Sequence, residues 1–200
     1  MKIRLLTLED IDTVTAIHQE RFPGSRSTLL GKPFLRKMYR WFIINYPELA
    51  LAAAVDGQVV GFAVGSMGGY GRRVFRHAIL EVMWGLMRHP NLVFNRSTFY
   101  LWRSYLRAFT PSFEKKEKLA SSNPEIVQAG FASLAVTKSA QGAGVLLIVS
   151  IERAAKRKGA NLISGTVRKD NVLLQRVYDN LGWQVLHETS VGITYSKRIS

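Results

Sequence analysis

Residues 134–183 constrain the fold of this chain more than any other stretch. A short apolar strand runs into a glycine turn, Gln141-Gly142-Ala143-Gly144, and a helical pattern follows without a gap. A second strand and a second helix come next, and that helix ends at the pair Gly182-Trp183. Strands that alternate with helices predict an α/β fold, in which the helices pack on a sheet.

The glycine turn is also the first functional signal. Backbone N–H groups at the start of a helix point outward, the helix dipole adds positive potential, and missing side chains let an anion approach. The turn predicts a phosphate-bearing ligand near Ala143. It has neither the G-x-G-x-x-G nor the G-x-x-x-x-G-K-[ST] pattern, so an ordinary strand-to-helix turn stays open as the alternative.

Two spacings in this stretch resemble the GNAT acetyltransferase superfamily. Asn171, Tyr178 and Gly182-Trp183 fit an N-x(6)-Y-x(3)-G-[FW] ending, and the turn that begins at Gln141 fits [QR]-x-x-G-x-[GA]. The last position of that second motif is Leu146, where the superfamily has Gly or Ala. The resemblance extends from Ile3 to about Tyr195. Residues 22–39 further resemble a subgroup associated with polysaccharide and glycoconjugate biosynthesis, through the pattern F-P-x(4)-[ST]-x-L-G-x-x-F-L-x-x-[LM]-Y.

The remaining elements follow from periodicity and turn signals. Helices are expected after a capping box at 7–10, over 28–45 with a restart at Pro33, over 144–158 with Gly159 as C-cap, and from Asp170 or Asn171 to 181. Strands are expected at 2–6, 49–55, 58–66, 128–136, 162–167, 184–188 and 191–196, with Asp56-Gly57 as a hairpin turn. The resemblance implies a single GNAT-like domain over 1–200, with a mixed, mostly antiparallel central sheet flanked by helices.

Residues 69–125 form a helical insertion between the third and fourth expected strands. Helices are predicted at 74–88 and 96–109, followed by a polar tract at 114–118 and a linker at 121–124. Arginines alternate with Trp, Tyr and Phe throughout the insertion. Such a segment can bind an anionic membrane surface or a nucleic acid. It can also be a helical hairpin that covers the sheet, an arm of a homodimer, or a lid over the acceptor.

Composition narrows the chemistry. The chain has no cysteine, which excludes disulfides, thiolate metal ligands and a cysteine nucleophile. None of its four histidines (His18, His77, His89 and His187) has a partner at H-x(3)-H spacing, so no metal site is expected. A net charge of +14 favours polyanions, anionic membranes or phosphorylated small molecules. No apolar run could span a membrane and no signal region starts the chain, so a cytoplasmic or membrane-peripheral protein is expected.

The resemblance implies acetyl-CoA as co-substrate, held between the strand ending at Val136 and the strand at 162–167. Leu134, Ala135 and Val136 would pair with the pantetheine arm through their main chain, although these residues are equally ordinary core residues. The backbone N–H groups of Gln141, Gly142, Ala143, Gly144, Val145 and Leu146 would bind the pyrophosphate. Asn171 would cap its helix and touch the cofactor.

Tyr178 is the candidate general acid. A phenol with a pKa near 10 is a suitable proton donor to a thiolate whose pKa is about 8.5. The alternative is a tyrosine that only packs beside Trp183.

The general base is less defined, because residues 130–133 contain no carboxylate where family members often have Glu. Glu125, His77 and His89 are candidates, and Ser133 could order a water molecule. Direct acetyl transfer to a primary amine is expected, with an amino sugar or its nucleotide- or lipid-linked form as acceptor. An RNA-directed GNAT-fold protein and a membrane-peripheral binding protein remain the alternatives.

Overall fold

The computed structural model describes residues 1–89, 126–140, 142–190 and 192–199. The predicted helix at 96–109, the polar tract at 114–118, the linker at 121–124 and the residues Gln141 and Glu125 lie outside this range. None of the described helices is long and apolar enough to cross a membrane.

A seven-stranded sheet forms the centre of the molecule, in the order β1-β2-β3-β4-β5-β7-β6. All neighbouring strands are antiparallel except β4 and β5, which are parallel. This confirms the predicted mixed, mostly antiparallel sheet. The strands are β1 (Lys2–Leu5), β2 (Ala50–Val55), β3 (Gln58–Met67), β4 (Gln128–Val136), β5 (Leu162–Arg168), β6 (Gln184–Glu188) and β7 (Gly192–Arg198).

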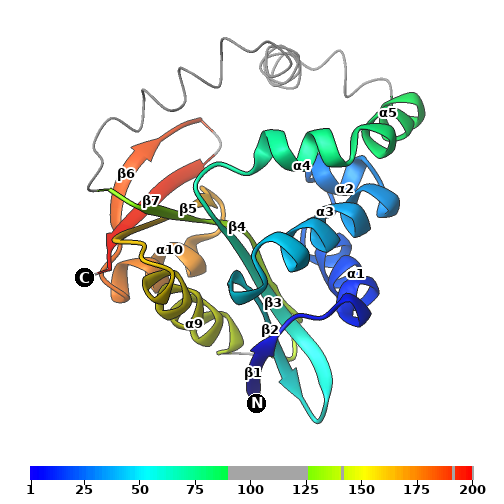
Figure 1. Cartoon of the computed structure of the whole chain (residues 1–200). Helices are drawn as coiled ribbons and strands as arrows, with labels where there is room; N and C mark the ends of the chain where they lie inside the picture. Colours follow the sequence, from blue (N-terminus) through cyan, green and yellow to red (C-terminus); the bar gives the residue numbers. More distant parts are fainter. Residues whose placement is uncertain (90–125, 141, 191, 200) are drawn as a thin grey trace.

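Helices cover both faces of the sheet (Figure 1). On one face lie α1 (Ile11–Arg21) and α3 (Lys32–Asn45), preceded by the 3-10 turn η1 (Leu8–Asp10) and by α2 (Arg26–Leu29) respectively. On the other face lie α9 (Ala143–Arg157) and α10 (Val172–Asn180). Because successive strand residues point to opposite faces, Ala50 and Ala52 join the α1/α3 core, whereas Leu51 and Ala53 join the α9/α10 core.

Local sequence explains most of these boundaries. Asp56 and Gly57 both have positive φ, at 48° and 81°, as a two-residue hairpin turn requires. Gly31 has a φ of 95° and Pro33 lies in the first turn of α3, so the predicted region 28–45 becomes two helices that restart at Lys32. Asn171 caps α10, since its Oδ1 accepts the Leu174 N–H at 3.2 Å.

The predicted helix at 74–88 was wrong in its continuity. The chain forms α4 (Gly71–His77) and α5 (Ile79–Arg88), separated at Ala78. Ala78 is fully buried with φ −112° and ψ 27°, outside the helical range. After the break, α5 has its own direction and buries Val82 and Gly85 against the protein. Tertiary packing therefore overrides an uninterrupted local helical pattern.

Candidate active site

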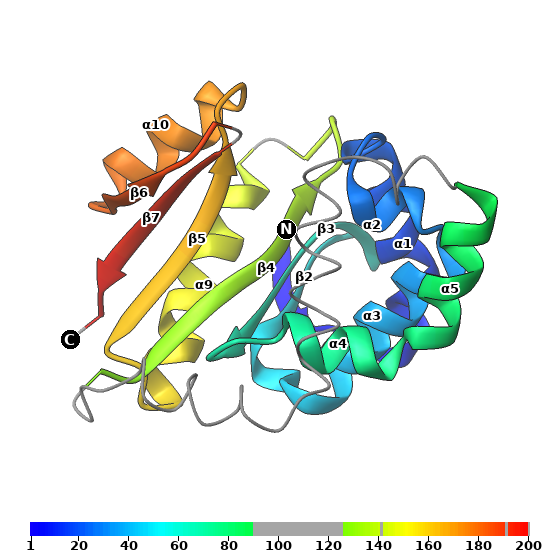
Figure 2. The same cartoon turned by 90° about the horizontal axis from the view of Figure 1, so that it is seen from above.

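The parallel pairing of β4 and β5 ends early and leaves the two strands diverging. Only three residue pairs form the ladder, and the last is Gly130 with Ser164. Beyond this pair, β4 is hydrogen-bonded only to β3 and β5 only to β7, so their edges that face each other are not paired with a described strand. Figure 2 shows the two strands spreading apart toward their C-terminal ends. We call the space between residues 131–136 of β4 and residues 165–168 of β5 the strand opening.

The predicted pantetheine-binding residues line this opening. Leu134, Ala135 and Val136 pair with β3 through Ala63, Phe62 and Gly61, and no described strand pairs with their other edge. A free strand edge presents unpaired N–H and C=O groups, which an extended amide-containing ligand can satisfy.

The glycine turn lies at the wide end of the opening, because α9 begins shortly after β4 ends. Gly142 is the N-cap of α9 in the left-handed conformation, with φ 85° and ψ −20°. Neither Gly142 nor Gly144 has an atom within 4 Å of the position that a Cβ would take, so the space around them is open. The arrangement is that of an anion site at a helix N-terminus.

Two N–H groups of the turn and of the first turn of α9 have acceptors within the protein. The Ala143 N–H donates to Ala140 O at 3.2 Å, and the Leu146 N–H donates to Gly142 O at 3.4 Å. The Gly144 N–H has no acceptor within the described part of the chain. Val145 and Leu146 have exposed side chains, and Ala143 is buried in the core. Of the N–H groups discussed, that of Gly144 is the one without an acceptor among the described residues.

Tyr178 lies under the opening on the α10 side of the sheet. Its ring stacks on Trp183 with a centroid distance of 4.4 Å and an angle of 12°. Its hydroxyl is directed at Gly165, where a Cβ atom would lie only 2.8 Å from the phenol oxygen. Gly165 is the first residue of β5 beyond the ladder with β4. The absent side chain thus brings the hydroxyl to the base of the opening.

Burial keeps Tyr178 neutral well into the alkaline range and makes it a weaker acid than a free phenol. The side chain is 3% exposed, and this desolvation, with a smaller contribution from the Glu152 charge, raises the pKa of its phenol well above the usual value near 10. Tyr178 is therefore a neutral phenol throughout the physiological range. Its hydroxyl forms no hydrogen bond with the described residues, so the proton is available to a ligand.

Glu152, which the sequence did not single out, supports this aromatic group. The Trp183 Nε1–H donates to Glu152 Oε1 at 2.7 Å, and Lys197 Nζ donates to Oε2 at 2.8 Å. Both carboxylate oxygens are engaged inside the protein, so Glu152 orients Trp183 beneath Tyr178. A lone Glu within the apolar helical pattern of α9 was the available signal.

A second polar chain reaches the opening from the α1/α3 side. The Tyr39 hydroxyl donates to Ser133 Oγ at 3.3 Å and lies 2.5 Å from His18 Nδ1. His18 Nε2 lies 3.2 Å from Ser27 Oγ and 3.4 Å from Ser25 Oγ. Ser133 belongs to the diverging part of β4. These hydroxyls and the imidazole therefore connect the opening to two partly exposed residues, Ser25 before α2 and Ser27 within it.

The middle of this chain is buried and uncharged. His18 is 4% exposed, and burial lowers its pKa from 6.5 to about 4. Burial also raises the pKa of Tyr39, which is fully enclosed. From the sequence, His18 was considered functionally only as a metal ligand, and Tyr39 only as the last residue of the 22–39 pattern. The sequence offered Ser133 as a residue that could order a water molecule, and did not connect it to His18 or Tyr39.

The other candidate bases lie elsewhere. His77 ends α4 and His89 follows α5, and both are exposed on the layer of helices away from β5. Neither has a described contact with the opening. No group of three or more His, Cys, Asp or Glu residues suited to a metal occurs in the part of the chain that the structure describes.

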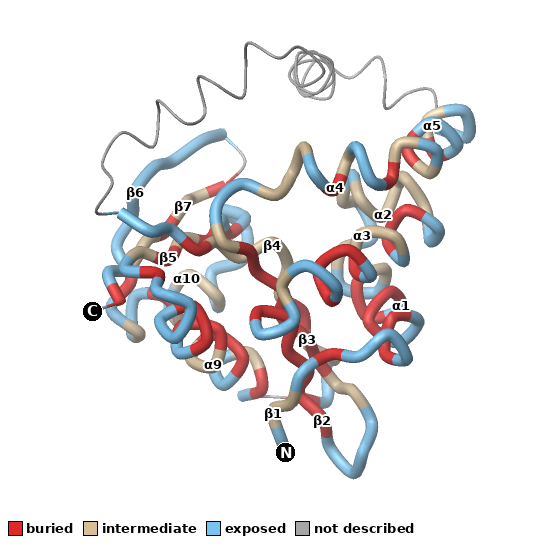
Figure 3. The backbone as a smooth tube through the Cα atoms, viewed as in Figure 1, coloured by how far each residue is buried: buried red, intermediate tan, exposed pale blue. Residues whose placement is uncertain are grey.

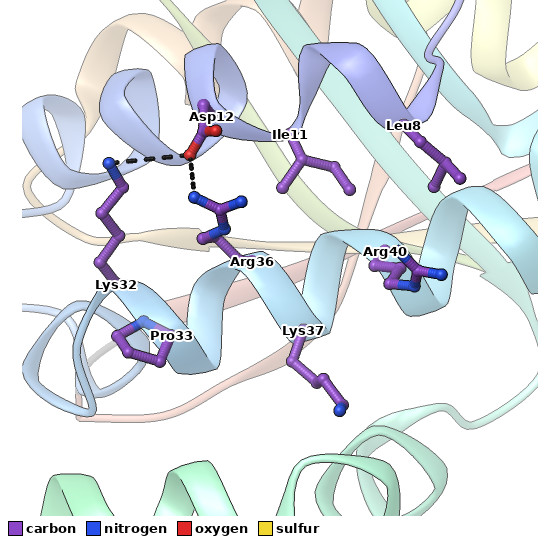
Figure 4. A pocket seen from close by; sticks show the side chains of 8 residues that line it. All are labelled: Leu8, Ile11, Asp12, Lys32, Pro33, Arg36, Lys37 and Arg40. Carbon is purple, nitrogen blue, oxygen red and sulfur yellow. Dashed lines mark hydrogen bonds and ion pairs between the residues drawn. The ribbon is translucent and has the colours of Figure 1, made fainter.

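A basic groove lies apart from the opening, between α1 and α3 (Figure 4). Its volume is about 600 Å³. The Asp12 carboxylate on α1 binds Arg36 Nη1 at 2.6 Å and Lys32 Nζ at 3.7 Å across the groove. Lys37 points toward α5, where its Nζ lies 3.5 Å from Glu81 Oε1. The residues that line it are Leu8, Ile11, Asp12, Lys32, Pro33, Arg36, Lys37 and Arg40.

Comparison with known proteins identifies the fold. No protein-family model and no curated protein sequence matches the chain. Among solved structures, Ard1 from Thermoplasma volcanium is similar with a TM-score of 0.61 and 17% identity, over 100% of this chain and 97% of that one. A ribosomal-protein-alanine N-acetyltransferase from Brucella melitensis is similar with a TM-score of 0.58 and 13% identity, over 99% of both chains.

A third similar structure contains the expected co-substrate. The structure of yncA from Salmonella typhimurium with its cofactor acetyl-CoA has a TM-score of 0.59 and 14% identity, over 100% of this chain and 94% of that one. The chain therefore has the GNAT acetyltransferase fold, as predicted. At these identities the likeness establishes the fold, while the chemistry has to be argued from the site.

Proposed function

We propose that this protein is an acetyl-CoA-dependent N-acyltransferase that moves an acetyl group directly to a primary amine. The observation that carries the proposal is the early end of the β4–β5 ladder beside the glycine turn of α9. Together they offer an extended ligand a free strand edge, and offer its phosphates a helix N-terminus. The structural similarity to a protein that contains acetyl-CoA supports the same choice of co-substrate.

In this proposal the pantetheine arm pairs with the β4 edge at Leu134, Ala135 and Val136. The pyrophosphate lies at the turn, where Gly142 and Gly144 leave space and the Gly144 N–H can donate. Asn171 holds the start of α10 at the same end of β5. No residue of the chain is acylated, which agrees with the absence of cysteine.

The bond changes need one proton donor and one proton acceptor. The neutral amine nitrogen attacks the thioester carbonyl carbon, the C–S bond breaks, and the sulfur leaves as a thiolate that takes a proton from the donor. The nitrogen loses its second proton to the same acceptor as the amide forms, and water protonates the donor again for the next turnover. Tyr178 is the proposed acid, since its neutral hydroxyl reaches the base of the opening at Gly165 and can give its proton to that sulfur.

The chain of Ser133, Tyr39 and His18 is the proposed route for the proton of the incoming ammonium group. Each of these groups both donates and accepts hydrogen bonds, so its hydrogens can point either way. Ser133 Oγ takes the proton and passes its own to Tyr39, which passes its proton to His18 Nδ1. His18 releases the proton from Nε2 through Ser27 to water, so no charge stays in the core. Such a relay replaces the carboxylate that β4 lacks.

The acceptor is proposed from the resemblance of residues 22–39 to a glycoconjugate-associated subgroup. An amino sugar, or its nucleotide- or lipid-linked form, provides the primary amine, and a phosphorylated form suits the net charge of +14. Incubation with acetyl-CoA and a panel of amines, amino sugars and tRNA, followed by mass spectrometry, tests this choice. Acetylation of tRNA that falls steeply with salt concentration would favour the RNA-directed alternative, whose support is the same excess of positive charge.

The co-substrate is tested separately by Gly144→Asp. Gly144 is preferable to Gly142, because Gly142 has a positive φ that strains any side chain, whereas Gly144 has open space and an ordinary backbone. The introduced carboxylate should repel the pyrophosphate and abolish CoA binding in calorimetry. Gly144→Asn, of equal size and no charge, is the matched control and should bind more tightly than the Asp variant. Equal, wild-type CoA affinity in both variants would contradict the assignment.

A further inference from the structure

Helix α5 presents an apolar stripe on its outer side. Leu80, Met83, Trp84 and Met87 are 75%, 53%, 50% and 69% exposed. Their spacing of i, i+3, i+4 and i+7 places all four on one side of the helix. A surface helix of a soluble protein normally has polar residues in these positions, so the stripe requires an explanation.

The opposite side of α5 holds the helix firmly on the protein. Val82 is 2% exposed, and Gly85 is buried against the turn between α2 and α3. A Cβ atom at position 85 would lie 2.6 Å from Leu30 O, so the helix approaches that turn as closely as a backbone can. The apolar stripe therefore faces outward by construction, as Figure 3 shows for the exposed outer rim of α5.

Positive charge surrounds this stripe. Helices α2, α3, α4 and α5 carry one, four, three and one Lys or Arg, nine in all, against one acidic residue, Glu81. Helix α1 on the same face adds Arg21 and the acidic residues Asp12 and Glu20. The Arg88 guanidinium lies over the Trp84 ring at 5.1 Å from its centroid. Lys37, at the edge of the basic groove of α3, reaches Glu81 on α5, so the groove borders the same helix.

We propose that the outer face of α5 docks on an anionic lipid bilayer. The four apolar side chains would enter the boundary between headgroups and acyl chains, with Trp84 at the depth that tryptophan favours. The cations of α3 and α4 would face the lipid phosphates. A nucleic acid fits less well, because the row of Leu, Met and Trp offers phosphates no cation, and the Trp84 indole N–H is its one side-chain donor.

This docking is independent of the proposed acetyl transfer, since it requires neither acetyl-CoA nor an acceptor. If both hold, the enzyme acts at a membrane surface, and lipid-linked amines become the favoured acceptors. CoA affinity measured on the same protein samples separates the two proposals, because α5 lies on the α1/α3 side of the sheet, opposite α9 (Figure 1).

Vesicle flotation with the full chain tests the apolar stripe. The wild-type protein should float with vesicles of phosphatidylcholine mixed with phosphatidylglycerol, and much less with phosphatidylcholine alone. The double variant Leu80→Gln/Met87→Gln changes the two most exposed stripe residues and should lower the membrane partition coefficient by about tenfold or more. Val185→Thr/Leu186→Gln on β6, where both residues are also exposed, is the matched control and should leave flotation unchanged.

A charge variant provides a second, independent readout. Arg40→Gln/Arg76→Gln removes exposed cations from α3 and α4, and should lower partitioning to anionic vesicles by roughly tenfold or more, at about 1 kcal/mol for each cation. Arg153→Gln/Arg157→Gln removes the same charge from exposed positions on α9 and should have a much smaller effect. Absence of wild-type flotation, or flotation that neither the α5 nor the α3/α4 variant weakens, would overturn the proposal. If the wild-type protein bound RNA and not vesicles, and the charge variant no longer bound RNA, the partner would be a nucleic acid and the proposal would be wrong.

Discussion

Tyr178→Phe separates catalysis from packing at the proposed active site. The phenylalanine ring can keep the stack on Trp183 at 4.4 Å and the contact with Tyr195 at 5.3 Å. The hydroxyl that is lost forms no hydrogen bond with the described residues, so the free energy of unfolding should change by less than about 1 kcal/mol. Chemical denaturation of both proteins measures this difference.

The activity should respond very differently. Loss of a general acid lowers kcat by roughly 10²–10⁴, which is about 2.7–5.4 kcal/mol of transition-state stabilisation. The Michaelis constants should change little, because the hydroxyl acts on the sulfur only as the C–S bond breaks. Initial rates can be followed by trapping the released CoA thiol with a chromogenic reagent, and the absence of cysteine in the chain removes any background.

The pH dependence adds a further test. Burial raises the pKa of Tyr178, so the wild-type rate should show no alkaline loss from this group below about pH 10. Tyr195→Phe is the control, because it removes a phenol from the same aromatic cluster whose hydroxyl is not directed at Gly165. A Tyr178→Phe variant with wild-type kcat, or one whose loss of rate is matched by the Tyr195→Phe control, would refute the assignment of Tyr178.

Three further outcomes follow from the buried contacts. Tyr39→Phe should lower kcat most strongly at low pH, where the amine is protonated, and a uniform loss at every pH would point to a structural role only. The folded-state pKa of His18 is depressed from 6.5 to about 4, so its contribution to stability is present above pH 6.5 and is lost as the pH falls toward 4, at most about 3 kcal/mol. His18→Gln should therefore flatten the pH dependence of unfolding between these values, and an unchanged slope would contradict it. Gly85→Ala should destabilise the protein by about 1–3 kcal/mol in thermal unfolding, since its Cβ would meet Leu30 O at 2.6 Å, and a neutral effect would show that α5 can shift.

The local sequence rules predicted the elements of this fold well. Asp56-Gly57 predicted the β2–β3 hairpin because few residues other than Gly, Asn and Asp tolerate positive φ at both turn positions. Asn171 and Gly159 predicted helix ends through short-range capping and a left-handed backbone, and both act as expected. The spacing from Asn171 to Trp183 also predicted the stack of Tyr178 on Trp183 as one alternative, since both lie at one helix end.

Local sequence rules could not predict the chain of polar contacts from His18 through Tyr39 to Ser133. His18 and Tyr39 are 21 residues apart, and Tyr39 and Ser133 are 94 apart. Each residue alone has the same sequence signature as any residue on a buried face. Glu152 is similar, since its partners Trp183 and Lys197 lie 31 and 45 residues further along the chain. Only a closed fold brings such side chains together, because loop closure has to occur before a contact of this kind exists.

The sequence by itself thus determined the kinds and order of the elements, the glycine turn and the positive charge, because these depend on neighbouring residues and on composition. The tertiary structure decided where the β4–β5 ladder ends, which makes the opening, and placed Tyr178 at Gly165 on one side of it and Ser133 on the other. It also broke the helix at Ala78 and turned the apolar side of α5 outward. These features depend on how strands and helices from distant parts of the chain pack together, and packing energy exceeds local preference wherever the two compete.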